Sequence, residues 1–306
     1  MAAEKLSQED RTRRIEKARR MLMSCRVCPR ACSVDRTGGK LGYCRTGSAA
    51  RVASANLHFG EEPPISGFLG SGTIFFSWCN LTCVHCQNFP ISQLGHGKEM
   101  TREELAGNMI DLQERGAHNI NLVTPSHCTP QVMDALDMAL KKGLKIPVVW
   151  NSSGYESVNT LKLLEGMVDI YMPDLKYSDD RNAKMLSDAD DYWRVATMAL
   201  KEMKRQVGDL QLDSAGLAKR GLLVRHLVLP GDLSGTQKVL KWISEELGTG
   251  TAVSLMSQYF PANKAHDVPG MDRKLDPGEY LTAVHWLKEY HLEQGWIQDE
   301  MLQGGA

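Results

Sequence analysis

The sequence has almost no net charge and no long apolar run. Its 306 residues include 36 basic and 37 acidic side chains, for a formal net charge of −1. This balance gives no electrostatic reason to expect binding to nucleic acid or to an anionic membrane surface. No apolar stretch approaches the ~20 residues that a membrane-spanning helix needs, and the first residues are too polar for a signal peptide. We therefore expect a cytoplasmic protein, in which the basic run from Arg11 to Arg20 is the solvated face of a helix.

Cysteine is scarce in the last two-thirds of the chain, which contain only Cys128. The other seven of the eight cysteines lie between Cys25 and Cys86. A disulfide framework would need an oxidising compartment, and nothing in the sequence targets one. The concentration of thiols instead favours sites for a metal ion or a cluster. Cys128 follows His127 and could donate a hydrogen atom or anchor a substrate, but a lone, partly buried thiol is the commoner case.

Short apolar runs alternate with helical patterns from about residue 72 onward. The predicted strands are 73–77, 119–123, 146–150, 168–172, 222–229 and 252–256. The predicted helices between and after them are 101–115, 129–142, 157–165, 191–207, 235–247 and 277–294. Helix starts are indicated by Thr101 followed by Glu104, and by Thr129 followed by Pro130.

Six strands that alternate with helices predict parallel βα units, two fewer than in a complete eight-unit barrel. The predicted fold is therefore α/β, a partial (β/α)6 TIM-like barrel over residues 71–260. Residues 1–70 form an N-terminal helix and a Cys-rich metal-binding extension in this prediction, and residues 261–306 form a C-terminal helical cover. In parallel barrels the chemistry collects at the carboxyl ends of the strands.

The spacing Cys79-x-x-x-Cys83-x-x-Cys86 places three thiolates on one loop, directly after the first predicted strand. Three cysteines can hold three corners of a cubane [4Fe-4S] cluster, whose usual complement is four. The fourth iron then stays open to a small molecule. A structural zinc site would need a fourth ligand, and His85, next to Cys86, would strain to reach the same metal.

The segment from Ser77 to Asn88 closely resembles the three-cysteine motif of the radical S-adenosylmethionine (SAM) enzymes. The resemblance implies that the open iron chelates the amino and carboxylate groups of SAM. It also implies that an electron from the cluster splits the sulfonium to give methionine and a 5'-deoxyadenosyl radical. A (β/α)6 partial barrel is the core fold of that superfamily, in agreement with the strand count.

Polar residues follow or end the predicted strands, where SAM would lie. SAM needs a cation for its carboxylate, acceptors for its ammonium and a group for its ribose hydroxyls. Asp174 and Lys176 supply one charge of each sign. The full set of predicted cofactor-binding residues is His85, Asn88, Ser126, Asn151, Ser153, Asp174, Lys176, Arg225 and Gln258.

The resemblance narrows to the pyruvate formate-lyase activating enzyme group, and within it to the PflX-like branch. It rests on 79–88, on Asp174-Leu175-Lys176 and on 224–231, and covers most of residues 72–260. It implies that Asn88 closes the cluster loop, that Asp174 and Lys176 engage SAM, and that a low-potential flavodoxin- or ferredoxin-like protein donates the electron.

Two positions depart from that group. It has a Gly-Gly-Glu segment after the second strand, whose backbone and carboxylate take the SAM ammonium, whereas this chain has Thr124-Pro125-Ser126-His127. Proline has no N–H, so the Ser126 hydroxyl or backbone carbonyls are expected to take the ammonium. His85 stands where an aromatic residue commonly stacks near adenine, and an imidazole can stack there too.

A second set of cysteines, Cys25, Cys28, Cys32 and Cys44, has a four-ligand pattern. It suits either structural Zn²⁺ or an auxiliary iron–sulfur cluster. We favour zinc slightly, because one closed four-thiolate site can anchor a segment with few apolar residues.

Three functions are compatible with these patterns. The first is a radical SAM enzyme that abstracts a hydrogen atom from a protein or peptide, as a glycyl-radical activase does. The second acts on a small molecule or an RNA nucleotide. The third is a non-catalytic metal-binding scaffold. An open barrel mouth would admit an extended polypeptide, whereas a small-molecule enzyme usually encloses its ligand.

Overall fold

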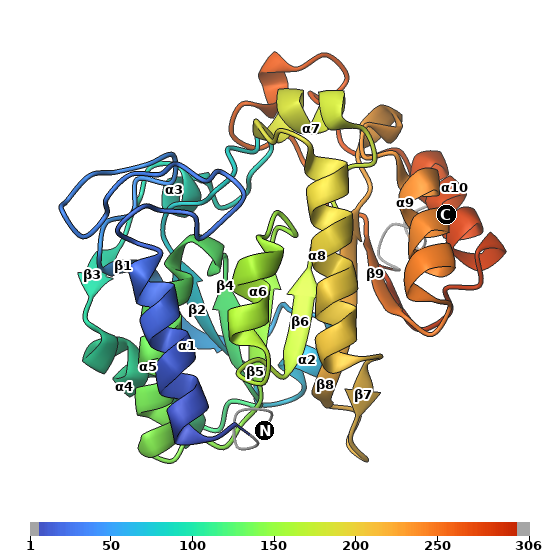
Figure 1. The fold of residues 1–306 in the computed structure, drawn as a ribbon. Helices are drawn as coiled ribbons and strands as arrows, with labels where there is room; N and C mark the ends of the chain where they lie inside the picture. The colour runs from blue at the N-terminus through green and yellow to red at the C-terminus, as the bar shows by residue number, and fades with distance from the viewer. Residues whose placement is uncertain (1–5, 299–306) are drawn as a thin grey trace.

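The computed structural model describes residues 6–298. At its centre is a twisted sheet, and helices lie along the outer side of this sheet (Figure 1). Six strands pair in parallel in the order in which they follow in the chain. They are β2 (Ser71–Phe76), β4 (Ile120–Val123), β5 (Val148–Ser152), β6 (Ile170–Pro173), β8 (Ala218–Leu227) and β9 (Ala252–Met256). All six predicted strands are present, and the predicted α/β partial barrel is confirmed.

Four further strands extend the sheet at its edges. β1 (Ala50–His58) pairs antiparallel with β2, and β3 (Lys98–Met100) pairs antiparallel with β1. β7 (Gln211–Leu212) pairs antiparallel with β8, and β10 (Gly295–Ile297) pairs in parallel with β9. The sequence analysis missed β1 because only its first residues alternate between buried and half-buried positions. The division at residues 70 and 260 stays a prediction, although both predicted extensions contribute a strand to the sheet.

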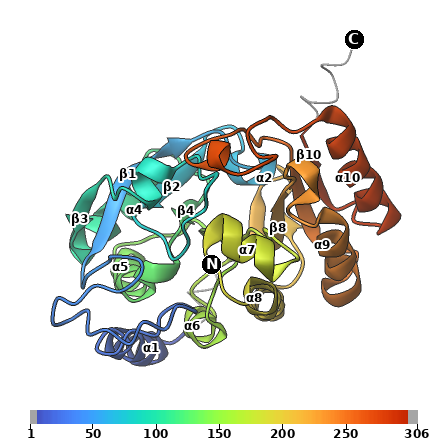
Figure 2. The ribbon, with the colours of Figure 1, turned by 90° about the horizontal axis from the view of Figure 1, so that it is seen from above.

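Helices cover the outer side of the strands (Figure 2). They are α1 (Gln8–Arg20), α4 (Arg102–Glu114), α5 (Thr129–Lys141), α6 (Val158–Leu164), α8 (Tyr192–Val207), α9 (Thr236–Trp242) and α10 (Pro277–Glu289). α9 continues as a π-helical turn over Ile243–Leu247. Each predicted helix is present. The short helices α2 (Pro63–Ser66) and α3 (Phe89–Ser92) and the two-turn α7 (Asp180–Ser187) were not predicted. Within residues 6–298, no helix has the length and apolar content to cross a bilayer.

The predicted C-terminal cover needs a correction. α10 is present, but it follows β9, packs beside α9 and leads into β10, so it is the outer helix of one more βα unit. The segment that reaches the cluster loop is the loop before α10, residues 257–276, which lies with α7 beyond the strand ends (Figure 1). It makes that contact through the Lys264 backbone N–H, which donates to the carbonyl of Val84 at 2.8 Å.

α2 closes the amino-terminal end of the barrel. β1 runs antiparallel to β2, so the chain that follows β1 lies at the end of the barrel opposite the cluster loop. Ile65 of α2 is fully buried in a cluster with inward-facing residues of the strands, among them Val149, Met172 and Leu223. The Asn119 amide donates to the Ile65 carbonyl at 2.7 Å. Apolar side chains around Ile65 therefore fill the amino-terminal end of the barrel, and the cluster loop lies at the opposite end.

Thr101 caps α4 as the sequence predicts. Its hydroxyl accepts from the Glu104 backbone N–H at 3.1 Å, and the Glu104 carboxylate accepts from the Thr101 N–H at 2.8 Å. Replacing Thr101 with Ala should lower the free energy of unfolding by about 1 kcal/mol, because the Glu104 backbone N–H loses its hydroxyl acceptor. Urea unfolding followed by circular dichroism measures the effect. Thr101→Ser, which keeps the hydroxyl, should stay close to the wild type; equal losses in both variants would contradict the capping argument.

Candidate active site

The cluster loop, residues 77–88, follows β2 and is held by segments distant in sequence. Trp78, the second residue of this loop, has a left-handed backbone conformation with φ 67°, which is strained for a non-glycine residue. The end of α7 fixes the loop backbone: the Thr82 N–H donates to the Ser187 carbonyl at 3.2 Å, and the Val84 N–H donates to the Leu186 carbonyl at 2.8 Å. These bonds set the direction in which the three thiols point.

Each thiol of the cluster loop has a hydrogen-bonding neighbour. The Ser187 hydroxyl donates to Cys83 Sγ at 3.0 Å, and Cys86 Sγ lies 3.1 Å from the Ser92 hydroxyl. Cys79 Sγ accepts from the backbone N–H two residues later, at 3.3 Å. Hydrogen bonds of this kind orient metal ligands and tune the group that they bind.

The spread of the three thiols fits a cluster rather than one ion. Nowhere in residues 6–298 do three Cys, His, Asp or Glu side chains converge closely enough to hold a single metal ion. In a cubane each thiolate binds a different iron, so the sulfur atoms stay apart. Burial, with the neighbouring Cys83 thiol, raises the pKa of Cys79, so its thiolate form needs cations nearby. The Lys176 ammonium is one such cation and opposes the rise.

Asp174 lies at the centre of a half-buried polar network at the carboxyl ends of the strands. Lys176 Nζ donates to Asp174 Oδ2 at 2.5 Å, and Arg225 Nε donates to Asp174 Oδ1 at 2.9 Å. Arg225 Nη2 also donates to Asn151 Oδ1 at 2.7 Å. Burial alone would raise the pKa of Asp174, but Arg225 and Lys176 hold it below its ordinary value. The carboxylate is therefore ionised and fixed in place at neutral pH.

Two carboxylates missed by the sequence analysis approach Arg225 from the other end of the barrel. Arg225 Nη1 lies 3.5 Å from Glu61 Oε2, and its Nε lies 4.0 Å from Glu62 Oε1. Burial raises the pKa of Glu61, and the charge of Arg225 opposes that rise. Arg225 thus joins the strand ends to the segment before α2 and acts as a positioning residue. The acidic pair ahead of Pro63 was the available signal in the sequence.

His85 and Ser153 present polar atoms that the rest of the described chain does not satisfy. His85 is buried against the rings of Tyr177 and Tyr259, at 6.5 and 6.1 Å between centroids. Burial, and then the charge of Lys176, lower the pKa of His85 to about 3, so its imidazole is neutral. Its Nδ1 and the Ser153 hydroxyl are buried without a hydrogen-bond partner among residues 6–298. Such atoms suit the polar edges of an adenosine group.

Three other predicted residues lie differently from the expectation. The Ser126 hydroxyl donates to Glu156 Oε1 at 2.6 Å, so it is already engaged by a buried carboxylate. The Gln258 side chain is exposed and bonded to Gln298 at 3.1 Å. Asn88 is exposed and precedes α3. Its backbone hydrogen-bonds to the Cys86 thiol and lowers that thiol's pKa, against the larger effect of burial. The structure therefore brings together Asn151, Asp174, Lys176 and Arg225, and turns Ser126 and Gln258 to other partners.

Tyr192, at the start of α8, is a further organising residue that the sequence analysis did not single out. Its hydroxyl donates to the Ser153 carbonyl at 2.9 Å and accepts from the Lys176 backbone N–H at 2.9 Å. It thereby fixes the ends of β5 and β6 relative to each other. Cys128 is fully buried in the main hydrophobic core, more deeply than the partly buried thiol that the sequence suggested.

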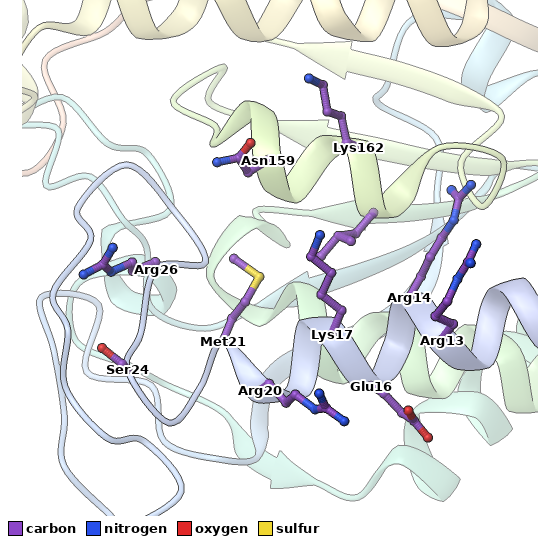
Figure 3. A pocket seen from close by; sticks show the side chains of 11 residues that line it. Arg13, Arg14, Glu16, Lys17, Arg20, Met21, Ser24, Arg26, Asn159 and Lys162 are labelled. Carbon is purple, nitrogen blue, oxygen red and sulfur yellow. The ribbon is translucent and has the colours of Figure 1, made fainter.

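A basic groove of about 910 Å³ lies on the outer surface between α1, α6 and the start of the Cys-rich segment. Figure 3 shows the side chains that line it. Six of them are cationic: Arg13, Arg14, Lys17, Arg20, Arg26 and Lys162. Glu16 is the carboxylate among the lining residues. Ser24 and Arg26, which flank Cys25, also line the groove, so it adjoins the N-terminal cysteines.

Comparison with known proteins places these features in a family. The family model of the radical SAM superfamily matches residues 73–210, which include the cluster loop, Asp174 and Lys176. The uncharacterized protein MJ0674 of Methanocaldococcus jannaschii is 30% identical over 287 residues, 92% of this chain and 79% of that protein. A second protein of that organism, MJ0808, is 24% identical over 80% of this chain and 73% of its own length.

Two solved structures are also similar. HydG, a maturase of the [FeFe]-hydrogenase, is 13% identical with a TM-score of 0.49, over 96% of this chain and 63% of its own. Methylornithine synthase, PylB, is 14% identical with a TM-score of 0.49, over 97% of this chain and 72% of its own. With the three-cysteine loop at the end of β2 and the family match over that loop, this chain belongs to the radical SAM superfamily.

Proposed function

We propose that this chain abstracts a hydrogen atom from a protein or peptide substrate, in the manner of the pyruvate formate-lyase activating enzymes. The observation that carries the proposal is the grouping of Cys79, Cys83 and Cys86 beside the half-buried Asp174–Lys176 pair. When bound, a [4Fe-4S] cluster and SAM supply the reductive cleavage that yields methionine and a 5'-deoxyadenosyl radical. The residues of this chain bind, orient and shield that chemistry.

Each side chain of the site has a distinct part in this proposal. The three thiolates hold the cluster and leave one iron open. Lys176 balances the negative charge of the thiolates and offers a cation to the SAM carboxylate. Asp174 fixes the Lys176 ammonium and offers an acceptor to SAM, while Arg225 holds Asp174. Neutral His85, between two tyrosine rings, offers its unpartnered Nδ1 to the adenine edge.

Apolar side chains near the cluster loop support a polypeptide substrate. Leu94, Met185 and Phe260 are 58%, 53% and 45% exposed, on three segments that contact the loop. The Gln93 amide donates to the Cys83 carbonyl, Leu186 accepts from Val84, and the Gln258 carbonyl accepts from Gln87. Exposed apolar side chains that form one contiguous patch mark protein-binding surfaces, and these three lie on segments that the cluster loop brings together.

Loss of one cluster ligand should abolish SAM cleavage. After anaerobic reconstitution with iron and sulfide, wild-type protein with dithionite and SAM should form 5'-deoxyadenosine. The rate for Cys83→Ala should fall at least ~100-fold, since even outer partners of metal ligands are worth roughly 10- to 100-fold. Chromatographic quantification of the nucleoside measures it. Cys128→Ser, outside both cysteine sets, should stay active. An inactive wild type would instead support a metal-binding scaffold.

Deuterium transfer should identify the substrate class. An extract of the source organism grown in D2O is separated into a macromolecular and a small-molecule fraction, and each is incubated with enzyme and SAM. We expect deuterium in 5'-deoxyadenosine only with the macromolecular fraction, and its loss after protease treatment. Mass spectrometry of the nucleoside measures the label. Transfer from the small-molecule fraction, or sensitivity to ribonuclease instead of protease, would contradict a polypeptide substrate.

We also propose that the basic groove receives the electron donor, an acidic flavodoxin- or ferredoxin-like protein. Lys17, Arg20 and Arg26 in this groove are exposed, and clustered charges of one sign raise the rate at which an oppositely charged partner associates. The position of the groove beside Cys25 supports a role in delivering electrons to the cysteine-bound groups.

Charge reversal in the groove should slow reduction by a protein donor. With limiting reduced flavodoxin, the double variant Lys17→Glu and Arg20→Glu should reduce the rate of 5'-deoxyadenosine formation by about 10-fold. The wild-type rate should fall with rising salt, because screening weakens the attraction. With dithionite as the reductant, the double variant and the wild type should form 5'-deoxyadenosine at similar rates. The matched control is Lys241→Glu with Lys288→Glu, two exposed lysines of α9 and α10. An equal effect in both double variants would argue against docking in the groove.

A further inference from the structure

The N-terminal cysteines surround one closed cavity. Val27, Arg30, Arg36, Gly42 and His127 contribute to its walls, together with the four thiol residues Cys25, Cys28, Cys32 and Cys44. Cys25, Cys28 and Cys44 are buried, and none of the chain's cysteines forms a disulfide. The space between the walls amounts to about 10 Å³, room for one water-sized sphere.

This arrangement does not fit a single zinc ion. Four thiolates around zinc lie about 2.3 Å from the metal, so all four sulfur atoms would have to lie close to one common centre. Among residues 6–298, however, the four cysteines do not belong to any group of three or more side chains close enough to ligate one ion. The cluster-loop cysteines share that property. In a cubane cluster, each thiolate binds its own iron at a corner, and the sulfur atoms stand farther from the centre.

The surroundings of the cavity favour a negatively charged occupant. Arg36 is 1% exposed, and its guanidinium donates to the carbonyls of Gly47 and His127 at 2.8 and 2.9 Å. Its Nη1 also lies 3.8 Å from Cys25 Sγ. A buried cation held otherwise by carbonyls is costly without an anion nearby. The Tyr43 N–H points at Cys32 Sγ, 3.4 Å away. Four thiolates around a cluster would supply the missing negative charge.

Glycine at position 42 lets the backbone approach the thiols. A Cβ atom added there would lie 2.9 Å from both Cβ and Sγ of Cys32. Because Cys32 is fixed by the loop, a larger residue would push its sulfur out of place. The absence of a side chain at Gly42 therefore leaves the room that the Cys32 thiol occupies in this second site.

The second site also touches the first. Arg30, between Cys28 and Cys32, donates from Nε to the carbonyl of Asn80 at 2.8 Å, and Asn80 lies between Cys79 and Cys83. Arg36 bonds to the His127 carbonyl, and His127 Nε2 lies 2.8 Å from the carbonyl of Ser77, at the start of the cluster loop. The two ligand loops are therefore in direct contact.

We propose that Cys25, Cys28, Cys32 and Cys44 hold a second [4Fe-4S] cluster, in contact with the SAM-binding cluster loop, in place of the zinc ion that the sequence favoured. The separation of the four thiols carries this proposal, and the buried Arg36 cation suits the negative charge of a four-thiolate group. It does not depend on the substrate or on the proposed activity.

The sharpest test removes the first site and reads the metal of the second. The triple variant Cys79→Ala, Cys83→Ala and Cys86→Ala, reconstituted anaerobically, should retain about four irons and four sulfides per chain. Its Mössbauer spectrum should be that of a diamagnetic [4Fe-4S]²⁺ cluster, and it should contain no stoichiometric zinc. One zinc per chain without iron, or no bound metal, would overturn the proposal. Activity plays no part in this readout, so failure of the proposed function would not affect it.

Wild-type protein and two further variants complete the test without relying on the triple variant. Wild type should contain about eight irons per chain, and Cys28→Ser with Cys32→Ser about four. Gly42→Ala, which keeps every ligand, should also fall towards four. Cys128→Ser is the control and should keep eight. Circular dichroism establishes that each variant is folded. About four irons plus one zinc in the wild type, or an unchanged iron content in the Cys28→Ser, Cys32→Ser protein, would refute a second cluster.

Discussion

The half-buried ionic network centred on Asp174 is the interaction on which the rest of the site depends. Asp174 accepts from both Lys176 and Arg225, while Arg225 reaches Asn151 on one side and Glu61 on the other. An isolated charge in the barrel interior would be strongly unfavourable, so these groups stabilise one another only when all are in place. The network therefore couples the ends of β5, β6 and β8 to the segment that closes the opposite end of the barrel.

The cluster loop depends in a similar way on parts of the chain that lie far from it in sequence. α7 supplies two backbone acceptors and the Ser187 hydroxyl, and the loop before α10 supplies the Lys264 N–H. The Cys-rich segment adds the Arg30 guanidinium. A loop with only its own short-range contacts could not hold three half-buried thiols at fixed positions, two of them, Cys79 and Cys86, with pKa values raised by burial. The fold thus gives the loop its shape before any cofactor binds.

Contact between the two cysteine loops gives the N-terminal segment a place in the architecture. It has little apolar content to bury, yet it is anchored at both ends of its cysteine pattern. The Thr160 hydroxyl of α6 donates to the Val27 carbonyl at 2.7 Å, and Arg36 bonds to Gly47 and His127. β1 then enters the sheet beside β2. The cysteine-rich segment is therefore part of the wall around the site. The antiparallel strand β1 also belongs to this wall.

The sequence by itself determined the six parallel strands, the helices between them, the Cys79–Cys86 loop and the Asp174–Lys176 pair. These features are written in local patterns: alternation of apolar runs, helix caps such as Thr101 with Glu104, and fixed spacings of cysteine. A few neighbouring residues are enough to specify each of these features, because hydrophobic periodicity and helix-end signals act between residues that are close in the sequence. β1 was not predicted because its alternation of buried and exposed residues is weak, and β10 was not predicted because it is only three residues long.

Only the tertiary structure decided how distant side chains pair. It turned Ser126 towards Glu156, brought Glu61 and Glu62 to Arg225, and placed Ser187 and Tyr192 against the site. It also separated the four N-terminal thiols around a cavity, a spacing that residue numbers do not reveal. The reason is physical: the distance between two side chains from different elements follows from how those elements pack, and no local sequence pattern encodes it.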